Sequence, residues 1–189
     1  MEKSYKKLWN LAYPYLKRAI RKNFVLHTQG VVKAMEFLLK KESGDARLLM
    51  PAAILHDTGW ATVPKKLQSS HKTSDKKLAL HLHIKNAPPI VRTILKKLNY
   101  SPQDIKKITT IIIAHKSASP KEKEKKLLID ADTLSDAFKK QFHSDIASYH
   151  TTPQQLLEFR RDNTFFTKTA KEIFKSELSK RARELKKLL

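Results

Sequence analysis

Histidine and aspartate stand in this 189-residue sequence at positions where a hydrophobic core would not require them. His56 and Asp57 are adjacent at the end of a small, apolar stretch. A buried imidazole beside a buried carboxylate costs free energy unless the two are paired or bind a metal. His27 shares a helical face with apolar residues, and Asp132 interrupts the apolar run LLIDADTL at 127–134. Two imidazole and two carboxylate donors are typical of sites for Mn, Fe, Co, Zn or Mg rather than softer metals.

These residues also carry a family resemblance. A His, then adjacent His-Asp, then a distant Asp is the signature of the HD-domain superfamily of metal-dependent phosphohydrolases, and the chain resembles it at His27, His56-Asp57 and Asp132. The surrounding residues agree, because AAILHDTG is close to the usual AALLHDIG and DADTL to the usual DADxL ending. The resemblance extends from about residue 24 to residue 138, and it implies an all-α HD-domain fold with a divalent metal site.

Some members of the superfamily have two further histidines, which give a second metal site that shares the carboxylate of the His-Asp pair. His83 resembles the first because the small residue Ala87 follows four positions later, and His115 resembles the second. His81 competes with His83, and residues two apart in a helix cannot face the same site. We expect His83 to be the ligand. The resemblance thus implies one or two divalent ions held by His27, His56, Asp57, His83, His115 and Asp132.

The chemistry implied by the resemblance is hydrolysis, in which the ions lower the pKa of a water molecule and hold a phosphate for in-line attack. The expected catalytic residues are His56 and Asp57, with Asp57 bridging two ions or binding one while it accepts the proton. For Asp130 and Asp136 we favour solvated carboxylates over partners that orient a ligand imidazole. Basic residues that could neutralise the substrate phosphates are Lys65, Lys66, Lys72, Lys76, Lys77, Arg92 and Lys116.

The residues after the His-Asp pair narrow the choice among relatives. Alarmone hydrolases carry acidic residues there and cyclic-di-GMP phosphodiesterases carry Gly-Tyr-Pro, whereas this chain continues with TGWATV at 58–63. The six-ligand pattern is similar to that of small stand-alone hydrolases, including iron-containing diadenosine tetraphosphate hydrolases, and also to that of mixed-valent di-iron oxygenases. We expect a phosphohydrolase acting on a nucleotide or another phosphoester, and the oxygenase stays as the alternative.

The charge of the chain opens an alternative of a different class. Lys and Arg number 39 against 18 acidic residues, a formal net charge of +21 that should attract polyanions. A basic helical nucleic-acid-binding module with a structural metal site therefore remains open, as does docking of residues 3–22 on a membrane surface. The expected partner is a phosphorylated small molecule, with nucleic acid as the alternative, and the oligomeric state is left open.

Composition excludes several other classes. The absence of cysteine rules out thiolate catalysis and cysteine-based metal sites. Three glycines leave no material for a Gly-rich phosphate loop. The apolar stretches are only a few residues long, whereas a bilayer span needs about 20. With no export signal in the sequence, we expect a cytoplasmic protein.

Helices must position the site. Apolar residues recur at three- and four-residue spacing, as in Val31, Met35 and Leu38, and strand-like alternation is not convincing anywhere, which predicts an all-α helical bundle. Pro88-Pro89 marks the start of one helix, and 58–77 is predicted to be an exposed loop. The predicted helices lie near 3–21, 24–41, 46–57, 76–86, 89–98, 102–116, 122–140, 154–160 and 164–188.

The domain organisation follows from this map and from the resemblance. We expect residues 1–189 to form a single HD-type domain. Its motif-bearing core covers about 24–138, and the segments 1–23 and 139–189 are expected to be flanking helices packed on that core.

Overall fold

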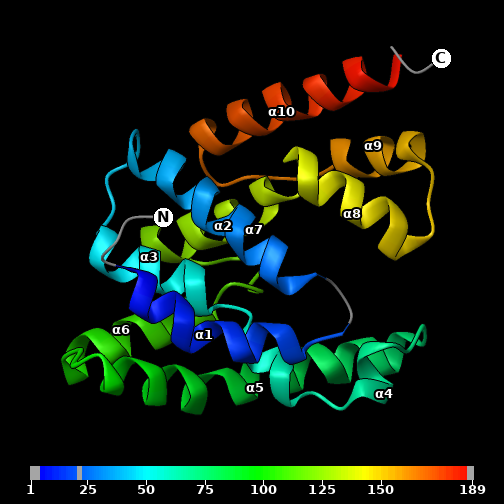
Figure 1. The fold of residues 1–189 in the computed structure, drawn as a ribbon. Helices are drawn as coiled ribbons and strands as arrows, with labels where there is room; N and C mark the ends of the chain where they lie inside the picture. The colour runs from blue at the N-terminus through cyan, green and yellow to red at the C-terminus, as the bar shows by residue number, and fades with distance from the viewer. Residues whose placement is uncertain (1–4, 21–22, 187–189) are drawn as a thin grey trace.

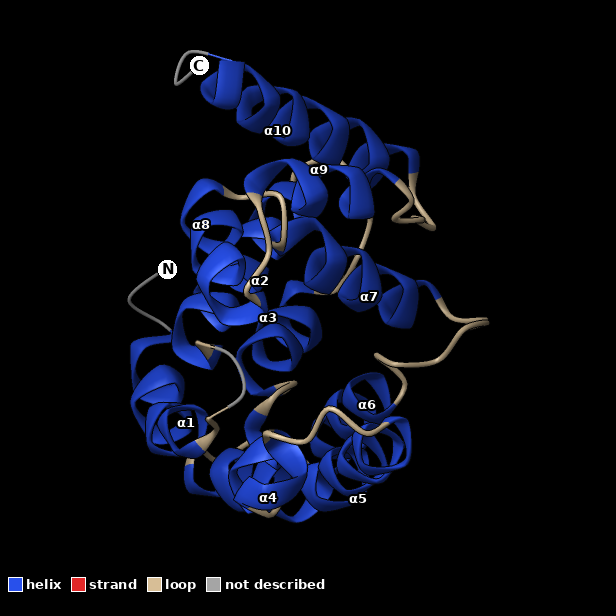
Figure 2. Ribbon diagram, turned by 90° about the vertical axis from the view of Figure 1, so that its right-hand side faces the viewer, coloured by secondary structure: helices blue, strands red, loops and turns tan. Residues whose placement is uncertain are grey.

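The computed structural model describes residues 5–20 and 23–186, which form helices and no strand (Figure 2). The predicted all-α fold is therefore confirmed. The predicted helix ends at 3, 21 and 188 lie outside the described residues. No described helix is both long enough and apolar enough to cross a bilayer. The elements are α1 (Lys6–Arg18), α2 (Phe24–Leu39), α3 (Ala46–Leu55), the 3-10 helix η2 (Thr58–Thr62), α4 (Lys65–Gln68), α5 (Thr73–Lys97), α6 (Pro102–Ile113), α7 (Lys123–Ser135), α8 (Lys139–Tyr149), α9 (Pro153–Arg161) and α10 (Lys168–Lys186).

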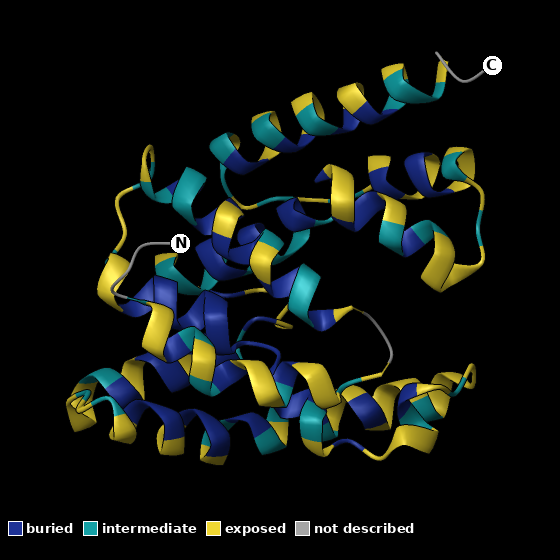
Figure 3. Ribbon diagram, viewed as in Figure 1, coloured by how far each residue is buried: buried dark blue, intermediate teal, exposed yellow. Residues whose placement is uncertain are grey.

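The helices are arranged in levels that can be followed in Figure 1. Helices α4, α5 and α6 lie at one end, α9 and α10 at the other, and α2, α3 and α7 between them. Helix α3 packs against α1, α2, α6 and α7. Every residue of α3 from Leu48 to Leu55 is buried (Figure 3). Because α3 is enclosed in this way, the His-Asp pair that follows it lies in the interior of the protein.

Helix α5 runs without a break through Pro88 and Pro89, so the predicted start of a new helix there is wrong. A proline inside a helix removes a backbone hydrogen bond and crowds the preceding turn, at a cost of about 3 kcal/mol. Packing offsets this cost, because Ala87 and Val91 are fully buried on the two sides of the prolines. Continuity matters for the site because the same helix carries His83.

The expectation of a loop over 58–77 is also wrong, because η2, α4 and the start of α5 occupy most of it, although most of residues 64–77 are exposed as expected. Trp60 and Val63 are buried in this segment. The side chain of Gln68 holds it together, since its Nε2 donates to the carbonyl oxygens of Trp60 (3.1 Å) and Val63 (2.8 Å). Its Oε1 accepts from the backbone N–H of Ile20 at 3.0 Å. One buried glutamine thus forms hydrogen bonds with backbone groups of a segment whose polar residues predicted an exposed loop.

The helix predicted near 122–140 is too long, because α7 ends at Ser135, and α8, which follows after a short turn, was not predicted as a separate helix. The guanidinium group of Arg160 on α9 donates to the backbone oxygen of Asp136, a carbonyl that the end of α7 leaves without a helical partner. Arg160 also forms a buried ion pair with Asp145 on α8. This one arginine therefore ties α7, α8 and α9 together.

Candidate metal centre

Histidine and aspartate side chains from distant parts of the chain meet at the end of α3. The residues with these side chains are buried, apart from Asp132, whose side chain is 12% exposed. They are His27 on α2, His56 and Asp57 directly after α3, His83 on α5, His115 directly after α6, and Asp132 on α7. The structure thus brings together all six residues that the sequence singled out.

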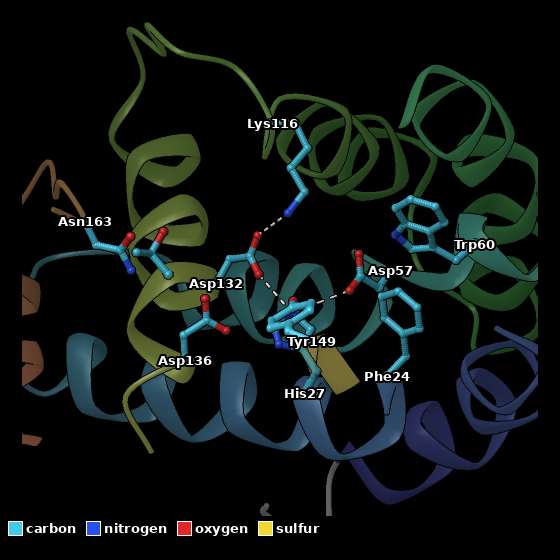
Figure 4. Close-up of a pocket in the computed structure, with 10 residues that line it drawn as sticks. Phe24, His27, Asp57, Trp60, Lys116, Asp132, Asp136, Tyr149 and Asn163 are labelled. Atoms are coloured by element: carbon cyan, nitrogen blue, oxygen red, sulfur yellow. Dashed lines mark hydrogen bonds and ion pairs between the residues drawn. The ribbon is translucent and has the colours of Figure 1, made fainter. Parts of the chain in front are cut away.

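The outer donor group consists of His27, His56, Asp57 and Asp132. Nε2 of His27 lies 2.9 Å from Oδ1 of Asp132 and 3.5 Å from Oδ2 of Asp57. Nε2 of His56 lies 3.2 Å from the same Oδ2 of Asp57. Figure 4 shows the ring of His27 between the two carboxylates. The donor atoms of His27, His56 and Asp57 are close enough together to hold one metal ion.

The inner donor group consists of Asp57, His83 and His115. Nε2 of His83 lies 3.5 Å from Oδ1 of Asp57, and Nε2 of His115 lies 3.8 Å from that oxygen. The two Nε2 atoms are 3.3 Å apart. These three donors could also hold one ion. Asp57 therefore presents Oδ2 to the outer group and Oδ1 to the inner group.

In His56 and His115 a hydrogen bond at the far ring nitrogen fixes which nitrogen faces the cluster. Nδ1 of His56 lies 2.9 Å from the carbonyl oxygen of Ala53, which can only accept, so Nδ1 carries the proton. His115 makes the same contact with the carbonyl oxygen of Ile112. These bonds leave the lone pair of Nε2 directed into the cluster, as a metal ligand requires.

His27 is oriented by a hydroxyl group. Its Nδ1 lies 3.2 Å from Oγ of Ser135, and that hydroxyl donates to the backbone oxygen of Asp132 at 2.8 Å. Because the hydroxyl proton is used in this way, Oγ accepts from Nδ1 of His27. Ser135 was not singled out in the sequence, although its position three residues after Asp132 is a helical spacing that brings it to the same face.

Three buried polar atoms of the cluster residues have no hydrogen-bond partner: Nε2 of His56, Oδ1 of Asp57 and Nδ1 of His83, and the first two face the cluster. A buried polar atom without a partner costs about 1–3 kcal/mol. One divalent cation in each group would satisfy the two atoms that face the cluster, and imidazole nitrogen with carboxylate oxygen is a donor set that such ions accept. The residues present therefore fit a metal ion.

Both carboxylates are ionised. Burial would raise the pKa of Asp57, but the surrounding imidazoles, that of His56 above all, hold it well below its usual range. Burial would likewise raise the pKa of Asp132, but Lys116 and His27 hold it well below its usual range. Both carboxylates are thus in the form that binds metal at neutral pH.

The imidazoles of the two groups differ in their affinity for protons. Burial lowers the pKa of His83 to about 4, and burial together with the charge of Lys116 lowers the pKa of His115 well below its usual value. Burial also acts to lower the pKa of His56, but the carboxylates of Asp57 and Asp132 outweigh it and raise that pKa. The inner histidines are therefore neutral at pH 7, whereas the carboxylates favour the protonated form of His56.

A cavity of about 300 Å³ opens beside the outer group. Among the described residues that line it, Lys116 is the one lysine or arginine, and its ammonium group pairs with Asp132. Arg92 and the lysines predicted from 65–77 do not line this cavity. The lining residues are Phe24, His27, Asp57, Trp60, Lys116, Asp132, Thr133, Asp136, Tyr149 and Asn163 (Figure 4).

Aromatic rings cover the inner group, which sequence reasoning missed. The ring of Trp60 stacks on His83 with centroids 4.7 Å apart and planes 13° apart. Phe24 stacks on the same Trp60 at 5.6 Å. The position of Trp60 three residues after Asp57 was the available signal. The prediction of an exposed loop concealed it.

The structure also settles the surroundings of the remaining candidates. His81 is exposed, so His83 is the member of the pair that lies in the cluster. Asp130 is buried and accepts from the α9–α10 connection, at 2.8 Å from the backbone N–H of both Phe166 and Thr167. The expectation of a solvated carboxylate is therefore wrong for Asp130. Asp136 lines the cavity rather than orienting a ligand imidazole.

Comparison with known families identifies this arrangement. The family model for the HD domain matches residues 24–137, well over half of the chain. The chain belongs to the HD-domain family. No curated protein and no solved structure matches it. HD domains belong to a superfamily of metal-dependent hydrolases that bind divalent metals, and the buried donor groups fit that property. Tyr149 and Asn163 come from beyond the segment that matches the HD domain.

Proposed function

We propose that this HD-domain protein is a metal-dependent phosphohydrolase whose substrate is a phosphorylated small molecule, a nucleotide or another phosphoester. The observation that carries the proposal is that the two carboxylate oxygens of Asp57 face two different pairs of histidines. Oδ2 faces His27 and His56, and Oδ1 faces His83 and His115. A single carboxylate in this position is suited to a centre of two cations, and a cavity beside it gives access.

The chain's own residues have separable roles in this reaction. The outer and inner donor groups would each hold one divalent ion, which, when bound, activates a water molecule and neutralises phosphate charge. His56 would contribute its Nε2 to the outer ion, with its ring fixed through Nδ1. Asp57 would share its two oxygens between the ions. With only the outer ion bound, Oδ1 of Asp57 would be left to accept the proton of the attacking water.

In this proposal Lys116 would contact the phosphate. It lines the cavity and reaches Asp132, so its ammonium group lies at the edge of the outer donor group. A phosphate in contact with the outer ion would therefore meet a positive charge from the protein as well. The volume of about 300 Å³ is at the small end of ligand pockets, which favours a small molecule over a polynucleotide.

The proposal is tested by metal content and turnover measured on the same sample. The protein is purified without added metal, and ions per chain are counted by elemental analysis. Phosphate release is then assayed on bis-p-nitrophenyl phosphate, p-nitrophenyl phosphate and a panel of nucleotides, with Mn or Fe added back. We expect up to two ions per chain and phosphate release that chelator abolishes and metal restores.

Two outcomes would contradict the proposal. Substrate turnover that consumes O₂ without releasing phosphate would indicate the oxygenase chemistry that the same donor set can support. Polynucleotide binding that falls steeply with salt, with no turnover under any metal and no response to chelator, would indicate a basic binding module instead.

A further inference from the structure

The cavity has two ends with different chemistry. At one end are Lys116 and three residues of the outer donor group, His27, Asp57 and Asp132. Asp136, Tyr149 and Asn163 also line the cavity, and we call these three residues the distal wall. Figure 4 shows Asp136 and Asn163 on the side of Asp132 that faces away from Asp57 and Trp60, and Tyr149 drawn over His27. The distal wall therefore lies where the part of a substrate beyond its phosphate would extend.

Buried charges fix the backbone of the distal wall. The segment after α9 that carries Asn163 is held at its far end by Asp130, which also accepts from the hydroxyl of Thr167 at 2.6 Å. At its near end Arg160 donates to the backbone oxygen of Asp136 and pairs with Asp145, and the N–H of Asn163 donates to the carbonyl oxygen of Arg160 at 3.2 Å. Buried ion pairs add little net stability. Their effect here is to fix where Asp136 and Asn163 stand.

The side chains of the distal wall suit a group that offers hydrogen-bond donors and a flat face. The carboxylate of Asp136 accepts hydrogen bonds, and the amide of Asn163 both donates and accepts. Tyr149, the last residue of α8, is 49% exposed and offers its ring at the opening of the cavity. None of the three described residues that form the wall is a lysine or an arginine. Oδ1 of Asp136 lies 4.0 Å from Nη2 of Arg160, which offsets part of its charge, and the remaining negative charge would disfavour a second phosphate there.

We propose that the distal wall binds the leaving group of the substrate, and that this group is the sugar and base of a nucleoside monophosphate rather than a further phosphate. The inference rests on the proposed phosphohydrolase function. The hydroxyl or amino groups of the nucleoside donate to Asp136 and bond with Asn163, and its base stacks on Tyr149. Two of these three residues lie outside the segment that matches the HD domain, so the C-terminal helices set the specificity.

The test compares substrates that share a phosphate and differ in leaving group. The ratio of kcat/KM for the four ribonucleoside monophosphates to kcat/KM for p-nitrophenyl phosphate is measured in wild type, Asn163→Ala, Tyr149→Ala and Tyr149→Phe. Loss of one hydrogen bond or one stacked ring should lower this ratio about tenfold in the two alanine variants. Tyr149→Phe, which keeps the ring, should retain most of it. Asp162→Asn, an exposed neighbour that does not line the cavity, is the matched control.

A second measurement separates this inference from the proposed function. Binding of adenosine, guanosine, cytidine and uridine to the metal-loaded protein is measured by calorimetry. If one of them binds and Asn163→Ala abolishes binding, the distal wall stands even if no phosphate is released by wild type. If wild type releases phosphate but the ratio is unchanged in both alanine variants, or if a nucleoside diphosphate or triphosphate is preferred, the distal wall inference is overturned while the hydrolase stands. Absence of both nucleoside binding and turnover overturns both.

Discussion

The outer and inner donor groups share Asp57 and differ in almost everything around it. The outer group has a second carboxylate, Asp132, and all its members except His56 line a cavity together with Lys116. The inner group has His83 and His115, neither of which lines the cavity, and His83 is covered by the ring of Trp60. The outer group is therefore placed to meet substrate. The inner group lies behind the outer group and is suited to hold a second cation there.

The same difference appears in the protonation of the imidazoles. Burial lowers the pKa of His83 to about 4, whereas the neighbouring carboxylates outweigh burial and raise the pKa of His56. Two groups that each contain two histidines are thus electrostatically distinct. The number of carboxylates and the access to solvent, rather than the number of histidines, separate the two groups.

The largest effect is expected from removing the carboxylate that both groups share. Asp57→Asn keeps the shape of the side chain but removes its charge, so neither group retains a bridging anion. Since loss of a residue that only supports a ligand already lowers metal affinity about 10–100-fold, we expect both ions to be lost and activity to fall below about 1% of wild type. Elemental analysis and phosphate release measure this. Full activity in the variant would contradict the metal mechanism.

Removing one histidine from each group should show whether the two groups bind metal independently. His83→Ala should lose only the inner ion and keep part of the activity, whereas His27→Ala should lose the outer ion and essentially all activity, because the outer group faces the cavity. Metal content and kcat measured on both variants check this. His81→Ala is the matched control, since His81 is exposed two residues away. Two ions retained in His83→Ala would show that the inner group is not a metal site.

Replacing Lys116 should test whether the outer group and its neighbours bind the substrate phosphate. Lys116→Gln loses a charged contact to the phosphate, and such contacts contribute about 1.5–3 kcal/mol, so we expect KM for a phosphoester to rise about tenfold or more. Burial raises the pKa of Asp132 and Lys116 counteracts it, so the pKa of Asp132 rises in the variant. Protons then compete with the outer ion at higher pH. The pH midpoint of metal loss on acidification should move upward, which a metal-indicator titration measures. An unchanged KM and midpoint would place Lys116 outside the mechanism.

The sequence predicted the cluster better than its surroundings. His27, His56-Asp57 and Asp132 could be found because charged and imidazole side chains stand out against apolar helical runs. Helical geometry allowed only one of His81 and His83, and the family resemblance, through Ala87 four residues later, favoured His83. The helical class followed from apolar spacing in the same way. Such patterns lie within short stretches of the sequence, so they could be recognised without knowledge of the tertiary structure.

The features that the sequence concealed depend on contacts between distant segments. Gln68 satisfies the backbone around Trp60 and so buries a segment that composition predicted to be exposed. Packing against η2 and α6 keeps α5 continuous through its two prolines. Arg160 ends α7 by binding the backbone of Asp136. The spacing of residues within one helix does not indicate contacts between distant segments. For the same reason the sequence could not predict that Tyr149 and Asn163 line the cavity.

The smallest effect is expected from a change that touches the inner group without removing a ligand. A Cβ added at Gly59 would lie 2.2 Å from the backbone oxygen of His83 and 3.0 Å from the backbone nitrogen of Ala87, so α5 must shift away from η2. Such overpacking costs about 1–3 kcal/mol of stability. His83 belongs to α5, the helix that must shift, whereas His27 belongs to α2. Gly59→Ala should therefore lower the affinity for the inner ion more than that for the outer ion.

A metal titration followed by elemental analysis, together with thermal unfolding, measures this effect. Gly30→Ala provides the matched control, since its added Cβ would meet the Cβ of Ser135 at 3.1 Å on the side of the outer group. If Gly59→Ala and Gly30→Ala weakened the same ion, the two donor groups would respond as one unit. The separation between an outer group that meets substrate and an inner group behind it would then be wrong.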